Sequence, residues 1–493
     1  MASPLYIAVD LGAGSGRVFL AGVDPGKLLL EEIHRFQYPP KEKSGHLRWD
    51  FSHIFEEIRS GLRKGAVRAR ELGRPIHSLG VDSWAVDYGL LDTGGNLIAD
   101  PVCYRDKRTR RAMERVFAVV PRSEIFEKTG IQFQVFNTLF QLYSAGESIK
   151  KAEKLLLLPD LINFFLTGKA VAEYTNATTT QMLNAATRCW DHELLEQLGL
   201  PGSLLPEIVP AGTDLGLLKT EIADELDLHC VHVIAPATHD TGSAVAAAPI
   251  SGNSAYISSG TWSLIGIERS SSLINERVGK LNFTNEGGAF GTIRFLKNVM
   301  GLWIFESCRS EWKAAGIDVA YHTILREIST ASDSQALIFP DDERFLNPPS
   351  MTEAIEQQMR ETGQQFDNEP VTISKIIFDS LAFRYASILR SIESLTGKDL
   401  NDIQILGGGG RNGYLNQMTA NASGLKAQAG LTEATVVGNV LVQAIAAGRF
   451  DSLSEARQYI RENFVFEEYL PERSPELDAA AFRYSEIESR FLS

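Results

Sequence analysis

The chain has 493 residues, too many for a single hydrophobic core, and at roughly 100 to 250 residues per domain we expect two or three domains. Its 48 basic and 62 acidic residues give a formal net charge of −14, which argues against a nucleic-acid or membrane-surface partner. The four cysteines lack metal-ligand spacing, and no apolar run reaches the roughly 18 residues of a membrane span. We therefore expect a globular protein with free thiols in the cytoplasm.

The first glycine-rich stretch lies between two apolar runs. Residues 6–10 and 17–23 have strand character and residues 11–16 join them, which predicts a β-hairpin. The spacing is not a dinucleotide fingerprint, because Arg17 stands where the third glycine would be and a strand follows where a helix would be needed. Bare backbone N–H groups in such a turn can approach phosphate oxygens closely. The alternative is an ordinary tight turn.

The next elements follow from apolar periodicity. Residues 28–36 are predicted to form a strand and residues 52–71 a helix. From 117 to 166 the pattern is helical and ends at Gly168, which suits a helix C-cap. We interpret residues 174–180 as a polar, threonine-rich loop.

The segment from 78 to 91 places acids beside an indole. Two apolar runs flank Asp82, Trp84 and Asp87. Carboxylates accept hydrogen bonds from hydroxyl groups while an indole packs on C–H faces, so this pattern suits a sugar. A strand pair with Trp84 in the core is the alternative.

Asp240 lies near the middle of the chain, between a strand-like run at 231–237 and a helix predicted to start at 244. Backbone N–H groups and the helix dipole favour anionic ligands at such a junction, so a carboxylate there can face a phosphorylated substrate. The alternative is that Asp240 merely caps the helix, since Asp is a preferred N-cap residue.

The second half repeats the opening pattern. A strand, a small-residue turn and a strand occupy residues 254–267, which suggests an internal duplication. Asn298 precedes a helix predicted at 300–312, and a long helix is predicted at 374–396. A strand then leads into four glycines, 407–410, that open another helix. Bare backbone at a helix N-terminus suits an adenine ring or a ribose phosphate, and the alternative is a flexible turn.

Together these motifs resemble the FGGY-type carbohydrate kinases of the actin and hexokinase superfamily. The resemblance is carried by AVDLGAGSGR (8–17), GVDSWAVDYGLLD (80–92), CYRDKRT (103–109), EYTNATTTQ (173–181), THDTGSA (238–244), YISSGTWSL (256–264), TNEGGA (284–289), LKNVMGLW (296–303) and GGGGRN (407–412). It implies an α/β fold with two duplicated actin-like (ribonuclease H-like) domains around a nucleotide cleft. The implied domains are 1–248 for the sugar and the catalytic base, 249–465 for the nucleotide, and a C-terminal tail at 466–493.

The resemblance also implies an activity, the Mg-ATP-dependent phosphorylation of the 1-hydroxyl of the ketose L-rhamnulose. Asp240 would be the general base, a role typically worth about 10² to 10⁴ in rate. The sugar would contact Trp84, Ala85, His239, Asp240, Thr241 and Asn298. ATP would contact Ala13, Gly14, Ser15, Gly16, Arg17, Thr261 and Gly408, and Mg²⁺ would lie near Asp10. The partners would be the small-molecule ketose and ATP, in a monomer or a homodimer.

One position departs from the family pattern. Glu306 stands where a glutamine that helps to bind ATP is expected, and a carboxylate near phosphates is repulsive unless it is protonated, paired or bound to metal. We therefore leave it out of the predicted site.

Three alternatives stay open. Another kinase of the same family, for L-fuculose, L-ribulose or D-xylulose, would share the phosphate-handling segments. A sugar-responsive regulator would need a helix-turn-helix segment and a basic surface, for which we find no signal. A filament-forming actin relative would lack the Thr-His-Asp and tryptophan segments.

Overall fold

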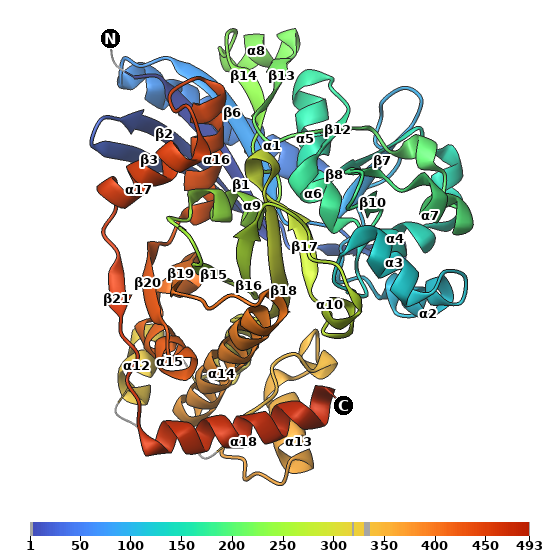
Figure 1. Ribbon diagram of the computed structural model, residues 1–493. Coiled ribbons are helices and arrows are strands. Elements are labelled where there is room, and N and C mark those ends of the chain that lie inside the picture. Colours follow the sequence, from blue (N-terminus) through green and yellow to red (C-terminus); the bar gives the residue numbers. More distant parts are fainter. Residues whose placement is uncertain (1–2, 318–319, 330–335, 493) are drawn as a thin grey trace. The chain divides into compact units, whose positions relative to one another are not determined.

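The computed structural model describes residues 3–317, 320–329 and 336–492 (Figure 1). The chain divides into two compact units, each assembled from three segments. The first unit comprises Met1–Pro249, Glu268–Phe295 and Ala434–Asn463, and the second comprises Ile250–Ile267, Leu296–Glu433 and Phe464–Ser493. The domain limits at 248 and 465 that the sequence suggests stay a prediction.

The first unit is built on a six-stranded sheet. Its strands, in spatial order, are β13 (Thr213–Leu217), β14 (His232–Ala235), β6 (Ile76–Ser83), β1 (Leu5–Gly12), β2 (Ser15–Asp24) and β3 (Lys27–Gln37). Strands β1 and β2 form the predicted antiparallel hairpin, and β1 runs parallel to β6. This register sets Asp10 opposite both Arg17 and Asp82, so three ionisable residues lie side by side on neighbouring strands.

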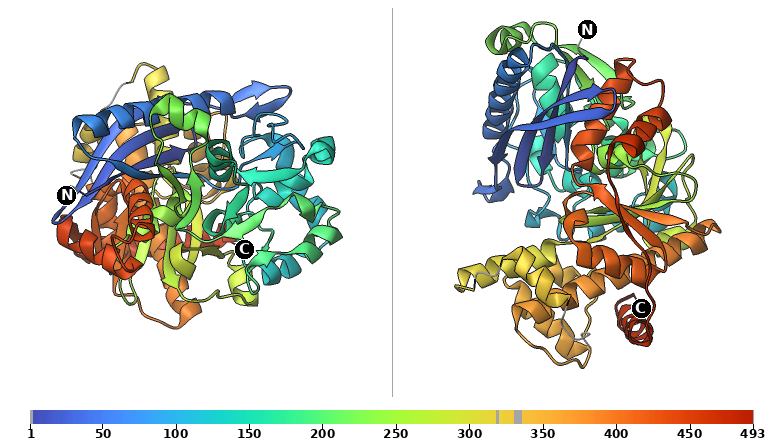
Figure 2. Two further views of the ribbon diagram at one scale, coloured as in Figure 1. Left: turned by 90° about the horizontal axis from the view of Figure 1, so that it is seen from above. Right: turned by 90° about the vertical axis from the view of Figure 1, so that its left-hand side faces the viewer.

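Helices cover both faces of this sheet. On one face, α1 (Phe51–Glu71) and α5 (Leu158–Thr167) bury apolar residues against alternate positions of β1, such as Ile7 and Val9. Figure 2 shows α1, in blue, lying along the first strands. On the other face lie α9 (Asp240–Ala247) and α16 (Ala434–Ala446), and Asn439 of α16 bonds to Asp82. Because side chains alternate along a strand, Asp10 shares this second face with Asp82.

The continuous helical pattern predicted for 117–166 is wrong, because the structure has short helices and one strand there. The segment contains α2 (Ala112–Phe117), α3 (Arg122–Thr129), α4 (Thr138–Tyr143) and a strand, β8 (Lys154–Leu157), before α5. The strand forms because its buried leucines pair with β7 (Tyr88–Leu91). Gly168 ends α5 with a φ of 84°, as its sequence position predicts.

The threonine-rich segment is a helix, not the predicted loop. Helix α6 (Tyr174–Thr179) is buried along its whole length. The side chain of Glu173 accepts a hydrogen bond from the Thr175 N–H, and the hydroxyl groups of Thr178 and Thr179 donate to carbonyls three residues earlier. These side chains satisfy backbone groups locally, so a sequence of low helix propensity forms a helix in the interior.

The second unit contains the second hairpin, formed by β15 (Ala255–Ser259) and β16 (Trp262–Arg269). Strand β15 also pairs in parallel with β19 (Asp402–Leu406), followed in the sheet by β20 (Lys426–Leu431) and β21 (Glu467–Tyr469). The long helix predicted at 374–396 is α14 (Pro370–Thr396), which is buried over most of its length. The elements after the hairpin start slightly differently from the prediction: Asn298 lies within β18 (Ile293–Met300), and α11 spans Trp303–Ala314.

The glycine run after β19 has a structural reason for two of its members. Gly407 has a φ of 81°, a conformation that side chains disfavour. A Cβ on Gly409 would lie 2.1 Å from the hydroxyl oxygen of Ser259, so the backbone approaches β15 too closely for a larger residue. Gly408 lies between them at the start of a short 3₁₀ segment, and a Cβ there would meet no atom within 4 Å.

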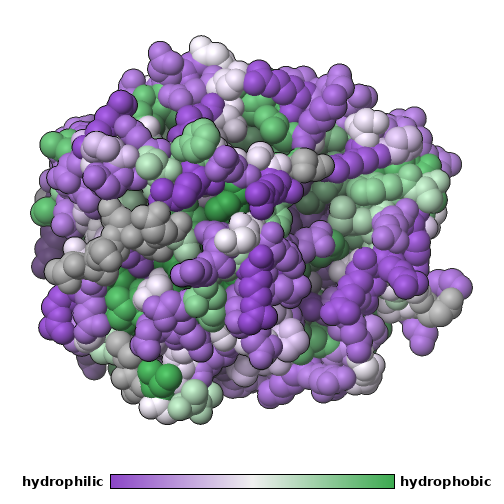
Figure 3. All heavy atoms as spheres, turned by 90° about the horizontal axis from the view of Figure 1, so that it is seen from below, coloured by the Kyte–Doolittle hydropathy of each residue, from purple (hydrophilic) through white to green (hydrophobic). Residues whose placement is uncertain are grey.

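The surface is mostly hydrophilic on the face that Figure 3 presents, with hydrophobic residues in separate groups. Among the helices that the structure describes, none is both long and apolar enough to cross a membrane.

Candidate active site

Three carboxyl groups of the first unit converge on one face of its sheet. Asp10 and Asp82 lie opposite each other on β1 and β6, and Asp240 is the first residue of α9, which follows β14. The negative charge of Asp10 contributes to the raised pKa values of both Asp82 and Asp240, which requires that the three groups be close. The first cause of both shifts is burial.

Asp240 occupies the first turn of α9 but is not its N-cap, since that position belongs to His239. Its Oδ1 accepts hydrogen bonds from the N–H of Thr241 at 2.5 Å and from the Thr241 hydroxyl at 3.1 Å. Burial, followed by the charge of Asp10, raises the pKa of Asp240 to about 7. A carboxylate with this pKa is suited to accept a proton at neutral pH, and its 29% exposed side chain is open to a substrate.

The first hairpin is held by a tyrosine that the sequence analysis did not identify. The hydroxyl of Tyr38 donates to the carbonyl oxygens of Gly12 at 2.6 Å and Ser15 at 2.9 Å. Gly14, between them, has a φ of 141°, which favours glycine. Arg17 follows the turn and forms an ion pair with Asp10. The side chain of Tyr38 therefore fixes the β1–β2 turn, which is the turn expected to bind phosphate.

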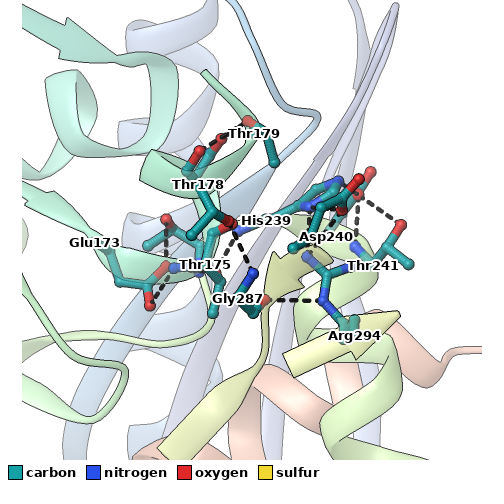
Figure 4. Close-up of polar contacts among 12 residues, drawn as sticks. Glu173, Thr175, Thr178, Thr179, His239, Asp240, Thr241, Gly287 and Arg294 are labelled. Atoms are coloured by element: carbon teal, nitrogen blue, oxygen red, sulfur yellow. Dashed lines mark hydrogen bonds and ion pairs between the residues drawn. The ribbon is translucent and has the colours of Figure 1, made fainter. Parts of the chain in front are cut away.

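His239 is held by a buried arginine. Nη2 of Arg294 lies 2.9 Å from Nδ1 of His239, and it lies 3.1 Å from the carboxylate of Glu286. Burial and the positive charge of Arg294 lower the pKa of His239 well below its ordinary value, so the ring is neutral. Figure 4 shows His239, Asp240 and Arg294 next to one another. Nε2 of the imidazole lies 3.4 Å from Asp240 Oδ1.

Asp82 is fixed by an amide from a distant part of the chain. Asn439 donates to Asp82 Oδ2 at 2.6 Å and to the carbonyl of Gly80 at 3.2 Å, while Gln443 donates to the carbonyl of Ile7 at 3.0 Å. These hydrogen bonds attach helix α16 to β1 and β6. Asp82 Oδ1 is buried and has no hydrogen-bond partner among residues 3–317, 320–329 and 336–492.

Trp84 is only 6% exposed and lies in an aromatic cluster, with ring centroids 4.7 Å from Trp49 and 6.0 Å from Tyr38. The indole N–H groups of Trp84 and Trp49 both donate to Asp87, at 3.0 and 2.7 Å. Trp84 therefore packs in the core, as in the alternative interpretation, but β6 and β7, which flank it, lie in different sheets and do not form the strand pair of that interpretation. A sugar contact by Trp84, or by its partly buried neighbour Ala85, stays a prediction.

The remaining predicted residues belong to the second unit. Thr261 lies between β15 and β16, and its carbonyl accepts the N–H of Gly301 at 3.1 Å. Asn298 lies in β18, and Gly408 begins the 3₁₀ segment after β19. The carboxylate of Glu306, in α11, pairs with Arg309 at 2.8 Å, which is one way to reduce its repulsion toward phosphates. Ligand contacts of these residues stay predictions.

The carboxylates of the first unit fit a magnesium ion. The structure, over the residues it describes, contains no group of three or more His, Cys, Asp or Glu side chains that could together hold a metal ion. Mg²⁺ in kinases is commonly held by one or two carboxylates together with phosphates and water, so a closed cage is not needed. Asp10, and the unpartnered oxygen of Asp82 beside it, provide such ligands, and a divalent cation would offset the repulsion among the acids.

Comparison with known proteins gives consistent matches over both halves. Residues 5–247 match the FGGY family of carbohydrate kinases, N-terminal domain, and residues 255–447 match the C-terminal domain of the same family. A protein named Rhamnulokinase from Oceanobacillus iheyensis is 42% identical over 462 residues, covering 93% of this chain and 96% of that protein. The Rhamnulokinase of Bacteroides thetaiotaomicron is 42% identical, covering 97% and 98%. That of Bacillus subtilis is 40% identical, covering 95% of each chain.

Solved structures share the fold. The gluconate kinase from Lactobacillus acidophilus superposes with a TM-score of 0.82 at 18% identity, covering 100% of this chain and 99% of that one. The Plasmodium falciparum glycerol kinase with ADP gives a TM-score of 0.79 at 16% identity with the same coverage. These similarities confirm the predicted two-domain α/β fold class.

Proposed function

Because the chain belongs to the FGGY family of carbohydrate kinases, we propose that it transfers the γ-phosphoryl group of ATP to the 1-hydroxyl of L-rhamnulose. The products are L-rhamnulose 1-phosphate and ADP. The choice of sugar is supported by relatives named Rhamnulokinase that are about 40% identical over nearly the whole chain. The reaction would be the kinase step of L-rhamnose catabolism in the cytoplasm.

The observation that carries this proposal is the environment of Asp240, a partly exposed carboxyl group in the first turn of α9 with a raised pKa. Its pKa of about 7 lets the ionised form accept the proton of a sugar hydroxyl at physiological pH. As the proton moves to Asp240, the hydroxyl oxygen bonds to the γ-phosphorus of ATP. The bond from that phosphorus to the β,γ-bridging oxygen breaks, and ADP leaves with that oxygen. The proton on Asp240 is then released to water.

The residues beside Asp240 are proposed to orient the sugar. His239 is a neutral ring with one donor and one acceptor nitrogen, and the hydroxyl of Thr241 lies at the same helix start. Ala85, Trp84 and Asn298 are the further proposed sugar contacts. Groups of this kind bind sugar hydroxyls by hydrogen bonds, and the loss of one matched hydrogen bond discriminates strongly between epimers.

The hairpin residues Ala13 to Arg17 are proposed to hold the ATP phosphates through their backbone N–H groups, with Arg17 supplying positive charge. Thr261 and Gly408 are proposed to bind the remainder of the nucleotide. Asp10 would hold Mg²⁺, which neutralises phosphate charge when it is bound. After burial, the charge of Asp10 also raises the pKa of Asp240, so Asp10 influences the base even without the ion.

A coupled ADP-release assay tests the proposal. The purified protein is given Mg-ATP with L-rhamnulose, L-fuculose, L-ribulose, D-xylulose or glycerol, each in turn. We expect the highest kcat/KM with L-rhamnulose. A preference for another sugar would replace the proposed substrate while leaving the kinase chemistry, and turnover with none of them would contradict the proposal.

A further inference from the structure

Glu173 is a buried carboxylate that touches the main chain just before Asp240. It is the last residue of β9 (Val171–Glu173) and is 0% exposed. Its Oε1 accepts the N–H of Thr175 at 3.0 Å, and its Oε2 accepts the Thr175 hydroxyl. Oε2 also accepts the N–H of Thr238 at 2.9 Å and the Thr238 hydroxyl at 3.0 Å. One carboxylate therefore joins the start of α6 to the residue two positions before Asp240.

The connection extends to the next peptide group. The N–H of His239 donates to the hydroxyl oxygen of Thr175 at 3.3 Å, and this hydroxyl donates in turn to Glu173. The carbonyl of Thr238 accepts the N–H of Ser83 at 2.9 Å, which fixes the other side of that residue. Figure 4 shows Glu173 and Thr175 on one side of His239, with Asp240 beyond it.

The first turn of α9 also packs tightly on Thr175. A Cβ added at Gly242 would lie 3.3 Å from the Thr175 hydroxyl oxygen and 3.3 Å from the Ala237 Cβ. The helix that carries Asp240 thus has little room to move toward α6. Its position depends on where Thr175 stands, and Thr175 is held by Glu173.

The four hydrogen bonds favour a carboxylate at this position. Each oxygen of Glu173 faces a backbone N–H, which can only donate, so both oxygens must accept. A second buried acid, Asp160, accepts the N–H of Glu173 at 3.3 Å. Burial and the neighbouring charge of Glu173 raise the pKa of Asp160 well above its ordinary value. Burial raises the pKa of Glu173 as well, but the four hydrogen bonds from Thr175 and Thr238 act in the opposite direction and stabilise its ionised form. These four donors favour Glu173 as the charged member of the pair.

We propose that Glu173 is a positioning residue for the catalytic base: through Thr175 and Thr238 it holds the peptide groups that precede Asp240 and thereby fixes the place of the Asp240 carboxylate. The inference rests on the proposed function, since it takes Asp240 as the base. Glu173 itself touches no substrate. A base displaced by about 1 Å can lose about 100-fold in rate, so support of this kind has kinetic consequences.

The kinetic test compares Glu173→Gln with Asp160→Asn. Glutamine keeps the shape but places an NH₂ group against donors, whereas Asp160 is an equally buried acid that, among the described residues, makes no hydrogen bond to 238–240. For Glu173→Gln we expect kcat to fall by about 10- to 100-fold with the KM for ATP within about 2-fold of wild type. For Asp160→Asn we expect kcat within about 3-fold of wild type, because its bond to the Glu173 N–H survives.

A second variant addresses the path of the effect. Thr175→Val removes the hydroxyl between Glu173 and the His239 N–H while keeping the side-chain volume. If both residues act through one chain of contacts, the double variant loses little more kcat than Glu173→Gln alone. Additive losses would overturn the inference, and so would an equal loss of kcat in Glu173→Gln and Asp160→Asn.

A measurement without substrate separates this inference from the proposed function. Hydrogen exchange of the peptide covering 236–242 is compared in wild type, Glu173→Gln and Asp160→Asn. We expect faster exchange only in Glu173→Gln. Loss of the carboxylate releases the N–H of Thr238 directly and the N–H of His239 through Thr175. Unchanged exchange would overturn the inference whichever sugar the enzyme uses. If wild type turns over a ketose other than L-rhamnulose, the kinetic comparison is made with that ketose.

Discussion

Nη2 of Arg294 lies 2.9 Å from Nδ1 of His239, and this contact decides which nitrogen of the imidazole carries the proton. A guanidinium group only donates, so Nδ1 of the neutral ring must accept. The hydrogen then resides on Nε2, which lies 3.4 Å from Asp240 Oδ1. Arg294 thereby fixes the tautomer of the residue that precedes the base, and after burial it is the second cause that keeps the ring neutral.

We predict that Arg294→Gln raises the pKa of His239 toward its ordinary value and increases the KM for the ketose by about 10-fold, since one misoriented hydrogen bond costs on the order of 1.5 kcal/mol. The imidazole titration can be followed by NMR and the KM by the ADP-release assay. An unchanged His239 titration would contradict the assignment.

The matched control is the double variant Arg294→Gln with Glu286→Gln. The single variant removes the cation that lies 3.1 Å from the buried carboxylate of Glu286, a loss that typically costs about 3 to 5 kcal/mol of folding free energy. The double variant removes both charges, so we expect it to unfold at a higher denaturant concentration than the single variant.

Asp240→Asn tests the base directly. The amide keeps the shape of the side chain but cannot accept the proton, so we expect kcat to fall by about 10² to 10⁴ while both substrates still bind. Single-turnover assays and equilibrium binding of the nucleotide and ketose measure the two effects. Turnover close to wild type in this variant would leave Asp240 with only a structural role at the helix start.

The same variant should be more stable than wild type at alkaline pH. Folding raises the pKa of Asp240 from the ordinary 3.8 to about 7, so the folded state binds the proton more tightly and wild type loses stability as the pH rises through this interval. Asparagine removes this loss. At pH 8 we expect a gain of at least about 1 kcal/mol in unfolding free energy, and at pH 3 no gain from this source. Urea unfolding at the two pH values measures the difference.

Several elements are predictable because their signals are local. The β1–β2 hairpin, α1 and α14 follow from strand alternation, turn residues and helical periodicity, which operate over short stretches of chain. Helix α6 is not predictable from local signals, because threonine and asparagine normally favour turns. Its hydroxyl groups and Glu173 supply the missing backbone partners, and this becomes visible only when the segment is buried against Thr238.

The residues of the candidate site also fall into two groups, those with a local sequence signal and those that depend on tertiary contacts. Asp10, Arg17 and Asp240 lie in short motifs at turns and strand ends, and the family resemblance of these motifs is what implies their roles. Glu173, Arg294 and Asn439 come from segments far apart in the chain, and their roles depend on tertiary contacts that no short pattern encodes. Arg294 offers one sequence signal, a charged residue among the buried apolar positions of β18. A buried arginine in a strand implies a specific partner, here His239 and Glu286.

The acidic limb of the pH profile should report Asp240. Protonated Asp240 cannot act as a base, so kcat/KM, which reflects the free enzyme, should fall as the pH drops through about 7. Since the charge of Asp10 is the second cause of the raised pKa, Asp10→Asn should shift the titration of the Asp240 carboxyl group to lower pH. Carbon-detected NMR of labelled aspartate follows that titration without turnover, which matters because Asp10→Asn also alters the proposed magnesium site. An Asp240 titration that Asp10→Asn leaves in place would mean that the carboxylates of β1 and α9 do not interact. A wild-type limb near pH 4 would mean that the pKa of Asp240 is not raised, and the base would then need another origin for its reactivity.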